Sequence, residues 1–183
     1  MKLWFTADTH WGQARTLELS KRPFDSVEQM DKQLIDNWNA VVTNEDTVYH
    51  LGDVGDLHRL NEINAKHIKL VMGNYEHTLN ILDSCNQLDN RIEIISLGSK
   101  IIIDNIEFAL VHKPEEVSNY MPIDYTLFYL FGHIHERQLV KRNGLNCGTD
   151  VHHFTPIDSD TIMFYYNAIK NHYDENVFVD RLG

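Results

Sequence analysis

The chain has 183 residues, of which 43% are hydrophobic and 23% are charged, and its formal net charge is −11. This length fits one domain spanning residues 1–183, and the acidic balance argues against a long nucleic-acid duplex as a partner. The two cysteines provide no disulfide framework, and no apolar run is long enough for a signal-peptide core or a membrane span, so we expect a cytoplasmic protein without a membrane partner.

Short apolar runs predict the strands of the fold. Five of them end in Gly, Asp, Asn or His: KLWFTAD, DTVYHLGD, HIKLVMGN, IEFALVH and TLFYLFGH. Two more, RIEIIS and KIIID, have no such polar end, and TIMFYY is read as a late strand. The Asp104-Asn105 pair between two apolar runs predicts a hairpin.

One helix is clearly indicated between the first two strands. Ser26 and Gln29 match a capping box, and apolar residues then recur at helical spacing from Val27 to Val42. Weaker patterns predict helices over His58–Ala65 and Tyr75–Cys85, and another from about Asn167 onward. Helices that alternate with strands early, and strands that crowd together later, indicate a layered α/β domain.

The ends of the predicted strands collect residues that bind metals. They are Asp8-Thr9-His10, Gly52-Asp53, Gly73-Asn74, His112 and Gly132-His133-Ile134-His135. On an extended segment, residues two apart point the same way, so Asp8 and His10 are expected to reach one cation together. These oxygen and nitrogen ligands suit hard or borderline divalent metals. Each piece alone has a plainer reading as a turn or a hydrogen-bonded histidine, but five such strand ends in order favour a metal site.

This ordered set resembles the calcineurin-like metallophosphoesterases. The resemblance covers about Lys2 to Asp158, and DTHWG, KRPFDSVEQMDKQLIDNWNAVV, DTVYHLGD and NCGTDVHHFTPI are similar to a small bacterial and phage branch of that family. It implies a four-layer αββα sandwich of two mixed sheets. It also implies an enzyme, a metal-dependent phosphoric ester hydrolase.

The resemblance further implies two divalent metal ions. Asp8, His10 and His135 match the ligands of one ion. Asn74, His112 and His133 match those of the other, and Asp53 matches the carboxylate that bridges both. Manganese is the ion we expect first, and iron, zinc, nickel, magnesium and cobalt are also compatible. A bridging hydroxide then attacks the phosphorus of a small phosphate ester while both metals stabilise the developing charge.

Tyr75 stands where many family members have the histidine that protonates the leaving oxygen. A phenol is protonated at neutral pH and could donate, but it suits neutral operation less well than imidazole. We therefore expect a phosphodiesterase, or a phosphatase for esters with a good leaving group. His77 is an alternative donor, and packing at a helix start is the alternative role of Tyr75. Glu76 is expected to orient its neighbours or to favour the helix N-terminus rather than to bind metal.

Two residues are candidates for substrate contact. Arg22 in KRPF could reach a phosphate, although it could instead anchor the Pro23 turn. Trp11 could offer a face for stacking a base, although core packing is commoner for tryptophan. For several other polar residues, a role in supporting the site and a purely structural role are both open: His50, Asn146, Asp150 and His153. Gln13 stands where close relatives often have His, so no role is assigned to it.

Three other readings compete with this one. A protein phosphatase of the same fold is disfavoured because the chain is short and has Tyr75 after Gly73-Asn74. A binding scaffold without chemistry would be expected to have lost ligands, whereas all seven are present. A single structural zinc takes about four ligands, fewer than this set provides.

Overall fold

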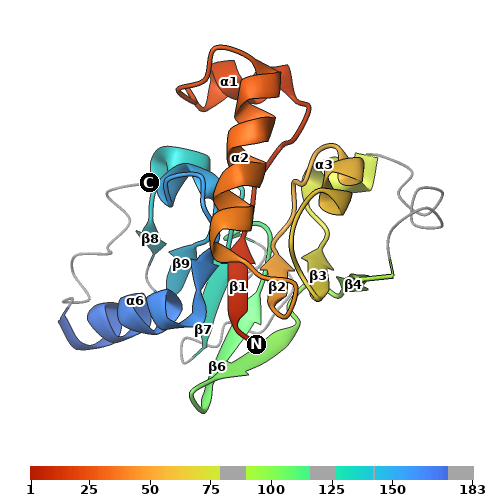
Figure 1. Cartoon of the computed structure of the whole chain (residues 1–183). Helices are drawn as coiled ribbons and strands as arrows, with labels where there is room; N and C mark the ends of the chain where they lie inside the picture. Colours follow the sequence, from red (N-terminus) through yellow and green to blue (C-terminus); the bar gives the residue numbers. More distant parts are fainter. Residues whose placement is uncertain (79–89, 116–126, 142, 173–183) are drawn as a thin grey trace.

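The computed structural model describes residues 1–78, 90–115, 127–141 and 143–172. Two five-stranded sheets form its centre (Figure 1). The first has the order β10-β1-β2-β3-β4, and the second has the order β5-β6-β7-β9-β8. Each sheet combines parallel and antiparallel pairs. The predicted α/β class with two mixed sheets is therefore confirmed.

The strands of the first sheet are β1 (Leu3–Thr6), β2 (Thr47–His50), β3 (His67–Val71), β4 (Ile92–Ile95) and β10 (Ile157–Asp158). Those of the second are β5 (Lys100–Ile103), β6 (Ile106–Leu110), β7 (Phe128–Phe131), β8 (Val140–Lys141) and β9 (Gly144–Asn146). The strands β1 to β7 fall within the predicted runs. The short strands β8, β9 and β10 were not predicted, because two or three residues carry too little periodicity.

Alternating side chains of the first sheet enter two different cores. Trp4 of β1 and Val48 of β2 pack in one apolar cluster with Trp38 of α2 (Val27–Val41), which covers the outer face of the sheet (Figure 1). Phe5 belongs to a second cluster with residues of β6 and β7, such as Phe108. The strand period of two therefore places β1 between a helix layer and the second sheet.

Helix α2 begins as the capping box predicted. The Ser26 side chain accepts a hydrogen bond from the Gln29 backbone at 3.2 Å. The Gln29 side chain accepts from the Asp25 N–H, one residue before the expected partner. The hairpin at Asp104-Asn105 is also present, and both residues have the positive φ angles that a tight turn of this kind requires.

Three local predictions differ from the structure. The TIMFYY segment belongs to helix α6 (Ser159–His172) and is not a strand, and this helix begins before the expected Asn167. Ile162, Tyr166 and Ile169 lie at helical spacing and pack into the core between the sheets, so tertiary packing outweighs their strand propensity. The helix expected at His58–Ala65 is a short 3-10 turn, η1 (Leu57–Asn61).

Two further helices, α1 (Ala14–Leu19) and α3 (Asn74–Thr78), follow strands of the first sheet. Helix α3 begins one residue before the predicted Tyr75, and the predicted part beyond residue 78 lies outside the described residues. Helix α1 was not predicted. None of the helices in the described part of the chain combines the length and the apolarity that crossing a membrane would require.

Candidate metal centre

All the predicted metal ligands follow the carboxyl ends of parallel strands. Asp8 and His10 follow β1, Asp53 follows β2, and Asn74 opens α3 just after β3. His112 follows β6, and His133 and His135 follow β7. Since β1, β2 and β3 are parallel to one another, as are β6 and β7, the two sheets direct these residues to one edge.

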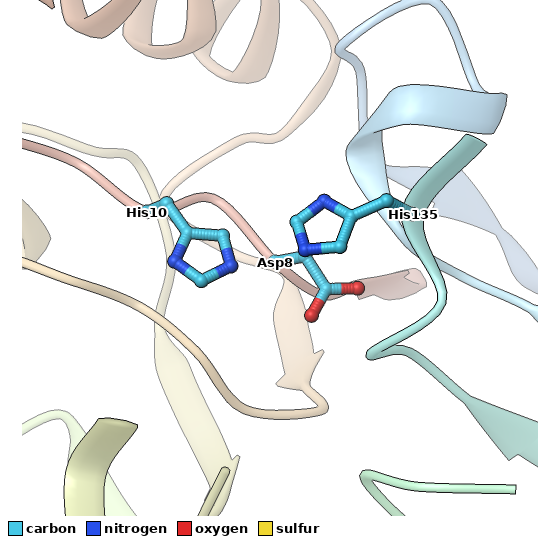
Figure 2. Close-up of side chains that lie close together, drawn as sticks. All are labelled: Asp8, His10 and His135. Atoms are coloured by element: carbon cyan, nitrogen blue, oxygen red, sulfur yellow. The ribbon is translucent and has the colours of Figure 1, made fainter. Parts of the chain in front are cut away.

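These residues gather in two groups. We call Asp8, His10 and His135 site A, and Asp53, His112 and His133 site B; within each group the candidate ligand atoms all lie within 4.8 Å of one another. Figure 2 shows the side chains of site A drawn together from the segment after β1 and the segment after β7. The rings of His10 and His135 lie nearly parallel, with their centroids 5.0 Å apart.

Asp53 belongs to site B and also faces site A. Its Oδ2 atom is 3.3 Å from His112 Nε2 in site B and 3.7 Å from His10 Nε2 in site A. Its Oδ1 atom accepts a hydrogen bond from the Tyr75 N–H at 3.0 Å. Asn74 joins site B, because its Oδ1 atom is 3.1 Å from His112 Nε2.

The backbone at these ligands is not extended. Five of the seven predicted ligands have positive φ angles: Asp8 (57°), His10 (50°), Asp53 (58°), His133 (72°) and His135 (50°). Left-handed conformations are uncommon for residues other than glycine, although Asp and His adopt them more readily than most, and they tend to concentrate at functional sites. Asp8 and His10 thus meet through two left-handed residues, not through the strand alternation expected from the sequence.

Two glycines allow the backbone to approach the carboxylates closely. A Cβ atom at Gly73 would lie 2.3 Å from Asp53 Oδ1, and one at Gly132 would lie 2.7 Å from Asp8 Oδ2. Both distances are shorter than any van der Waals contact. The glycines beside Asn74 and His133 are therefore required by the close packing around the carboxylates of Asp8 and Asp53.

Three of the histidines are oriented through their Nδ1 atoms. His10 Nδ1 is 2.7 Å from the Gln13 side-chain oxygen, and His112 Nδ1 is 2.7 Å from the Leu51 carbonyl. His135 Nδ1 is 2.9 Å from a carboxylate oxygen of Asp150. Because these oxygens accept hydrogen bonds, each Nδ1 carries the proton and each Nε2 is left to bind another group.

The electrostatics of the centre favour a bound cation. Burial raises the pKa of Asp8 to about 6, since nothing fully compensates the buried charge. Burial would lower the pKa of His112, but its hydrogen bond to Asp53 and the charges of Asp8 and Asp53 raise it to about 9. The raised pKa values show that Asp8 and His112 bind protons more readily than usual, and bound cations would supply the same positive charge.

The Nε2 atom of His10 is suited to bind a cation. His10 Nε2 is buried and has no hydrogen-bond partner among the described residues, and burial lowers the pKa of His10 to about 4, so this nitrogen can act as an acceptor. A neutral imidazole nitrogen beside two carboxylates is a donor set that divalent cations accept. The residues present therefore fit the two metal ions that the sequence resemblance implied.

Comparison with known proteins assigns the family. The family model described as calcineurin-like phosphoesterase superfamily domain matches residues 1–154. The chain belongs to this superfamily. An uncharacterized protein of Methanocaldococcus jannaschii is 27% identical over 176 residues, which cover 88% of this chain and 89% of that protein. The gene 66 protein of Mycobacterium phage L5 is 36% identical over 87 residues, 42% of either chain.

Two solved structures share the fold. A protein of unknown function from Aquifex aeolicus superposes with a TM-score of 0.67 and 19% identity, covering 90% of this chain and 98% of that one. A novel archaeal phosphodiesterase superposes with a TM-score of 0.50 and 19% identity, covering 86% of this chain and 98% of that one. At this identity, the likeness concerns the fold alone.

Glu76 supports the loops that carry the site. It is 1% exposed, and its carboxylate accepts hydrogen bonds from the backbone N–H groups of Asp53, Val54 and Gly73 at 2.6–2.8 Å. It thereby joins the loop after β2 to the start of α3. Glu76 acts as an orienting residue in this superfamily member, as expected from the sequence.

Of the two candidate proton donors, one is placed at the site. The Tyr75 ring is half-buried and lies edge-on to the His10 ring, with centroids 4.9 Å apart. His77 lies in α3, and its side chain is outside the described part of the structure. The structure therefore describes Tyr75, but not His77, beside site A.

Neither predicted substrate contact is available to a substrate. Trp11 is fully buried and packs against Trp38 with ring centroids 5.9 Å apart, so it is a core residue and cannot stack a base. Arg22 is 4% exposed, and its guanidinium donates to Asp150 and to backbone carbonyls. The prediction that these residues bind substrate is wrong, because both side chains face inward.

The supporting residues were harder to recognise from the sequence. Gln13 is three residues after His10, a spacing that a turn brings together, but the residue type alone did not identify a role. Asp150 lies in the NCGTDV segment, which marked it as a candidate without indicating its partner. The Leu51 carbonyl carries no signal in the sequence, because any residue could supply it.

Proposed function

We propose that the chain hydrolyses a small phosphodiester, such as a nucleotide diester, or an activated phosphomonoester, with two divalent metal ions held at sites A and B. One observation carries this proposal: the Asp53 carboxylate faces a histidine of each site, at 3.7 Å from His10 and 3.3 Å from His112. A single carboxylate between two ligand groups is the arrangement that two neighbouring cations need to offset their repulsion.

The bound ions would supply Lewis-acid stabilisation of the phosphate oxygens and an activated water as the nucleophile. The protein positions the reaction around them. Asp8 and Asp53 provide anionic oxygens, and Asn74 provides a neutral one, so the ligand set leaves positive charge for a phosphate. Gln13, Leu51 and Asp150 hold the histidine rings in place. Manganese is the ion we propose first, because the ligands combine carboxylate, amide and imidazole.

Tyr75 underlies the proposed preference for diesters and activated esters. Its ring lies beside His10 at the rim of site A. A phenol is a weaker general acid at neutral pH than an imidazolium, so leaving groups that require little protonation should react best. A diester with a nitrophenolate leaving group meets this condition.

A comparison of substrates tests the proposal. Protein freed of metal and reloaded with Mn²⁺ or Ni²⁺ is assayed with bis(p-nitrophenyl) phosphate and with p-nitrophenyl phosphate. We expect turnover of both only with metal, and faster turnover of the diester. Turnover of the monoester alone would contradict the diester preference, and no metal-dependent turnover of either would contradict the proposed function.

Substitution of Tyr75 tests the proposed donor. Tyr75→Phe should slow a diester with an alkoxide leaving group about tenfold or more, because an alkoxide needs a proton, and should change nitrophenolate release little. The ratio of the two rates is the measurement. An unchanged rate with the alkoxide ester would remove Tyr75 from the mechanism.

A further inference from the structure

Arg22, Asp150 and His135 form a chain of buried contacts between segments that are far apart in the sequence. Arg22 Nε lies 2.8 Å from Asp150 Oδ1, and Arg22 Nη2 lies 2.8 Å from Asp150 Oδ2. The same Oδ2 atom is 2.9 Å from His135 Nδ1. The side chains of Arg22 and Asp150 are 0% and 3% exposed, so the pair is shielded from solvent.

Arg22 also holds the other half of site A. Its Nη2 donates to the Asp8 carbonyl at 2.5 Å, and its Nη1 donates to the Thr9 carbonyl at 2.9 Å. Asp8 has a left-handed backbone (φ 57°), a conformation that needs support from its surroundings. One guanidinium therefore fixes two ligands of site A, Asp8 through its own carbonyl and His135 through Asp150.

Asp150 is better suited to orient a ligand than to be one. His135, Glu136 and Asp150 lie close enough to suggest a third ion site. However, both carboxylate oxygens of Asp150 face the Arg22 guanidinium, and a cation there would be repelled by that fixed positive charge. A carboxylate that accepts from the Nδ1 of a metal-binding histidine fixes the ring and makes it a more basic ligand.

His112 of site B is held differently. His112 Nδ1 is bonded to the main-chain carbonyl of Leu51, and no described contact joins site B directly to Arg22 or Asp150. A described link between site B and the residues that Arg22 holds runs through Asp8, whose carboxylate accepts from the His133 N–H. A change at Asp150 should therefore act on one site and leave the other intact.

We propose that Asp150, clamped by Arg22, is a positioning residue that sets the affinity of site A for its metal ion independently of site B. This inference rests on the proposed dinuclear function. It gives the KRPF and NCGTDV segments a shared role: each supplies one partner of a contact that supports His135.

Binding of Mn²⁺ to Asp150→Asn tests the proposal, with Asp46→Asn as the matched control. The substitution at position 150 keeps the shape of the side chain, but the new amide group would face Arg22 or His135 with a donor in place of an acceptor. Asp46 is also a buried, hydrogen-bonded aspartate, and its partners are Lys2, Trp4 and Thr43, away from the site. Calorimetry gives the affinities, and electron paramagnetic resonance distinguishes paired from isolated Mn²⁺.

The wild type and Asp46→Asn should bind two ions tightly. Asp150→Asn should bind one ion with wild-type affinity and the other about 10–100-fold more weakly, so that a spectrum of isolated Mn²⁺ replaces the coupled one. Arg22→Lys keeps the positive charge but loses the two parallel N–H donors that hold Asp150, so it should weaken binding of the same ion. It serves as the second variant if Asp150→Asn does not fold.

Unchanged affinities in Asp150→Asn or Arg22→Lys would overturn the proposal, as would an equal loss at both sites. Failure of the proposed function would show differently, since the wild type itself would then bind fewer than two ions.

Discussion

Sites A and B both combine carboxylate and imidazole groups, but different parts of the molecule hold their histidines in place. The histidines of site A rest on side chains, His10 on Gln13 and His135 on Asp150. In site B, His112 rests on the main-chain carbonyl of Leu51. Substitution of residues that are not ligands can therefore weaken metal binding at site A. The carbonyl that supports His112, in contrast, belongs to the main chain and is kept when a side chain is substituted. Asp53 faces a histidine of each site, so a change at Asp53 should weaken metal binding at both sites.

The largest effect is expected at Asp53. Asp53→Asn removes the anionic oxygen that faces both sites, so turnover of bis(p-nitrophenyl) phosphate should fall about 1,000-fold or more, which corresponds to about 4 kcal/mol. Circular dichroism should show that the variant remains folded. Unchanged turnover in this variant would contradict the two-metal mechanism.

The next effect concerns the scaffold that the two sites share. Glu76→Ala leaves three buried N–H groups of Asp53, Val54 and Gly73 without their acceptor. At about 1–3 kcal/mol for each unsatisfied group, the free energy of unfolding should fall by about 3 kcal/mol or more. Urea unfolding measures this change. The exposed Glu28 provides a control, because Glu28→Ala should change stability by less than about 1 kcal/mol. Equal losses in the two variants would count against the orienting role of Glu76.

A smaller effect is expected at Gln13, and it tests whether sites A and B bind metal independently. Gln13→Ala removes the acceptor for His10 Nδ1 and should weaken Mn²⁺ binding at site A about tenfold while leaving site B unchanged. Leu51→Val is the comparison, because it shortens a buried side chain but keeps the carbonyl that holds His112. It should lower stability by about 1 kcal/mol without altering either affinity. A loss of site B affinity in Gln13→Ala would break the proposed independence.

The smallest effect lies away from both sites. Burial would raise the pKa of Asp46, but hydrogen bonds from Lys2, Thr43 and Trp4 outweigh it and lower the pKa to about 2. Because the folded pKa is depressed, the stabilisation is present above the unfolded pKa of about 4 and is lost as the pH falls toward 2. Asp46→Asn should therefore cost about 1 kcal/mol at neutral pH and almost nothing near pH 2. Urea unfolding at both pH values checks this, and a constant difference would contradict it.

The meeting of the candidate ligand residues at one edge could be predicted because they follow recognisable strands. A polar residue after an apolar run marks a strand end, and the ends of parallel strands meet at one edge of a sheet. The expectation that Asp8 and His10 meet through strand alternation was nevertheless wrong. Their φ angles are 57° and 50°, and the carbonyls of Asp8 and Thr9 accept hydrogen bonds from Arg22, a contact that no local pattern reveals.

The roles of Arg22 and Trp11 could not be read from their positions. A basic residue near a phosphate site suggests substrate binding, but the partner of Arg22 lies 128 residues further along the chain. Trp11 follows a ligand directly, yet its ring turns into the core beside Trp38. In both cases, tertiary packing decides the direction of the side chain. The same reason explains TIMFYY, whose strand propensity gives way to the core contacts of α6.

Titration of metal-free protein with Mn²⁺, followed by electron paramagnetic resonance, tests most directly whether Asp53 joins two metal sites. The wild type should bind two ions whose signals are magnetically coupled, and Asp53→Asn should lose the coupling. One isolated ion in the wild type, or coupled ions that persist in Asp53→Asn, would contradict a centre bridged by this carboxylate.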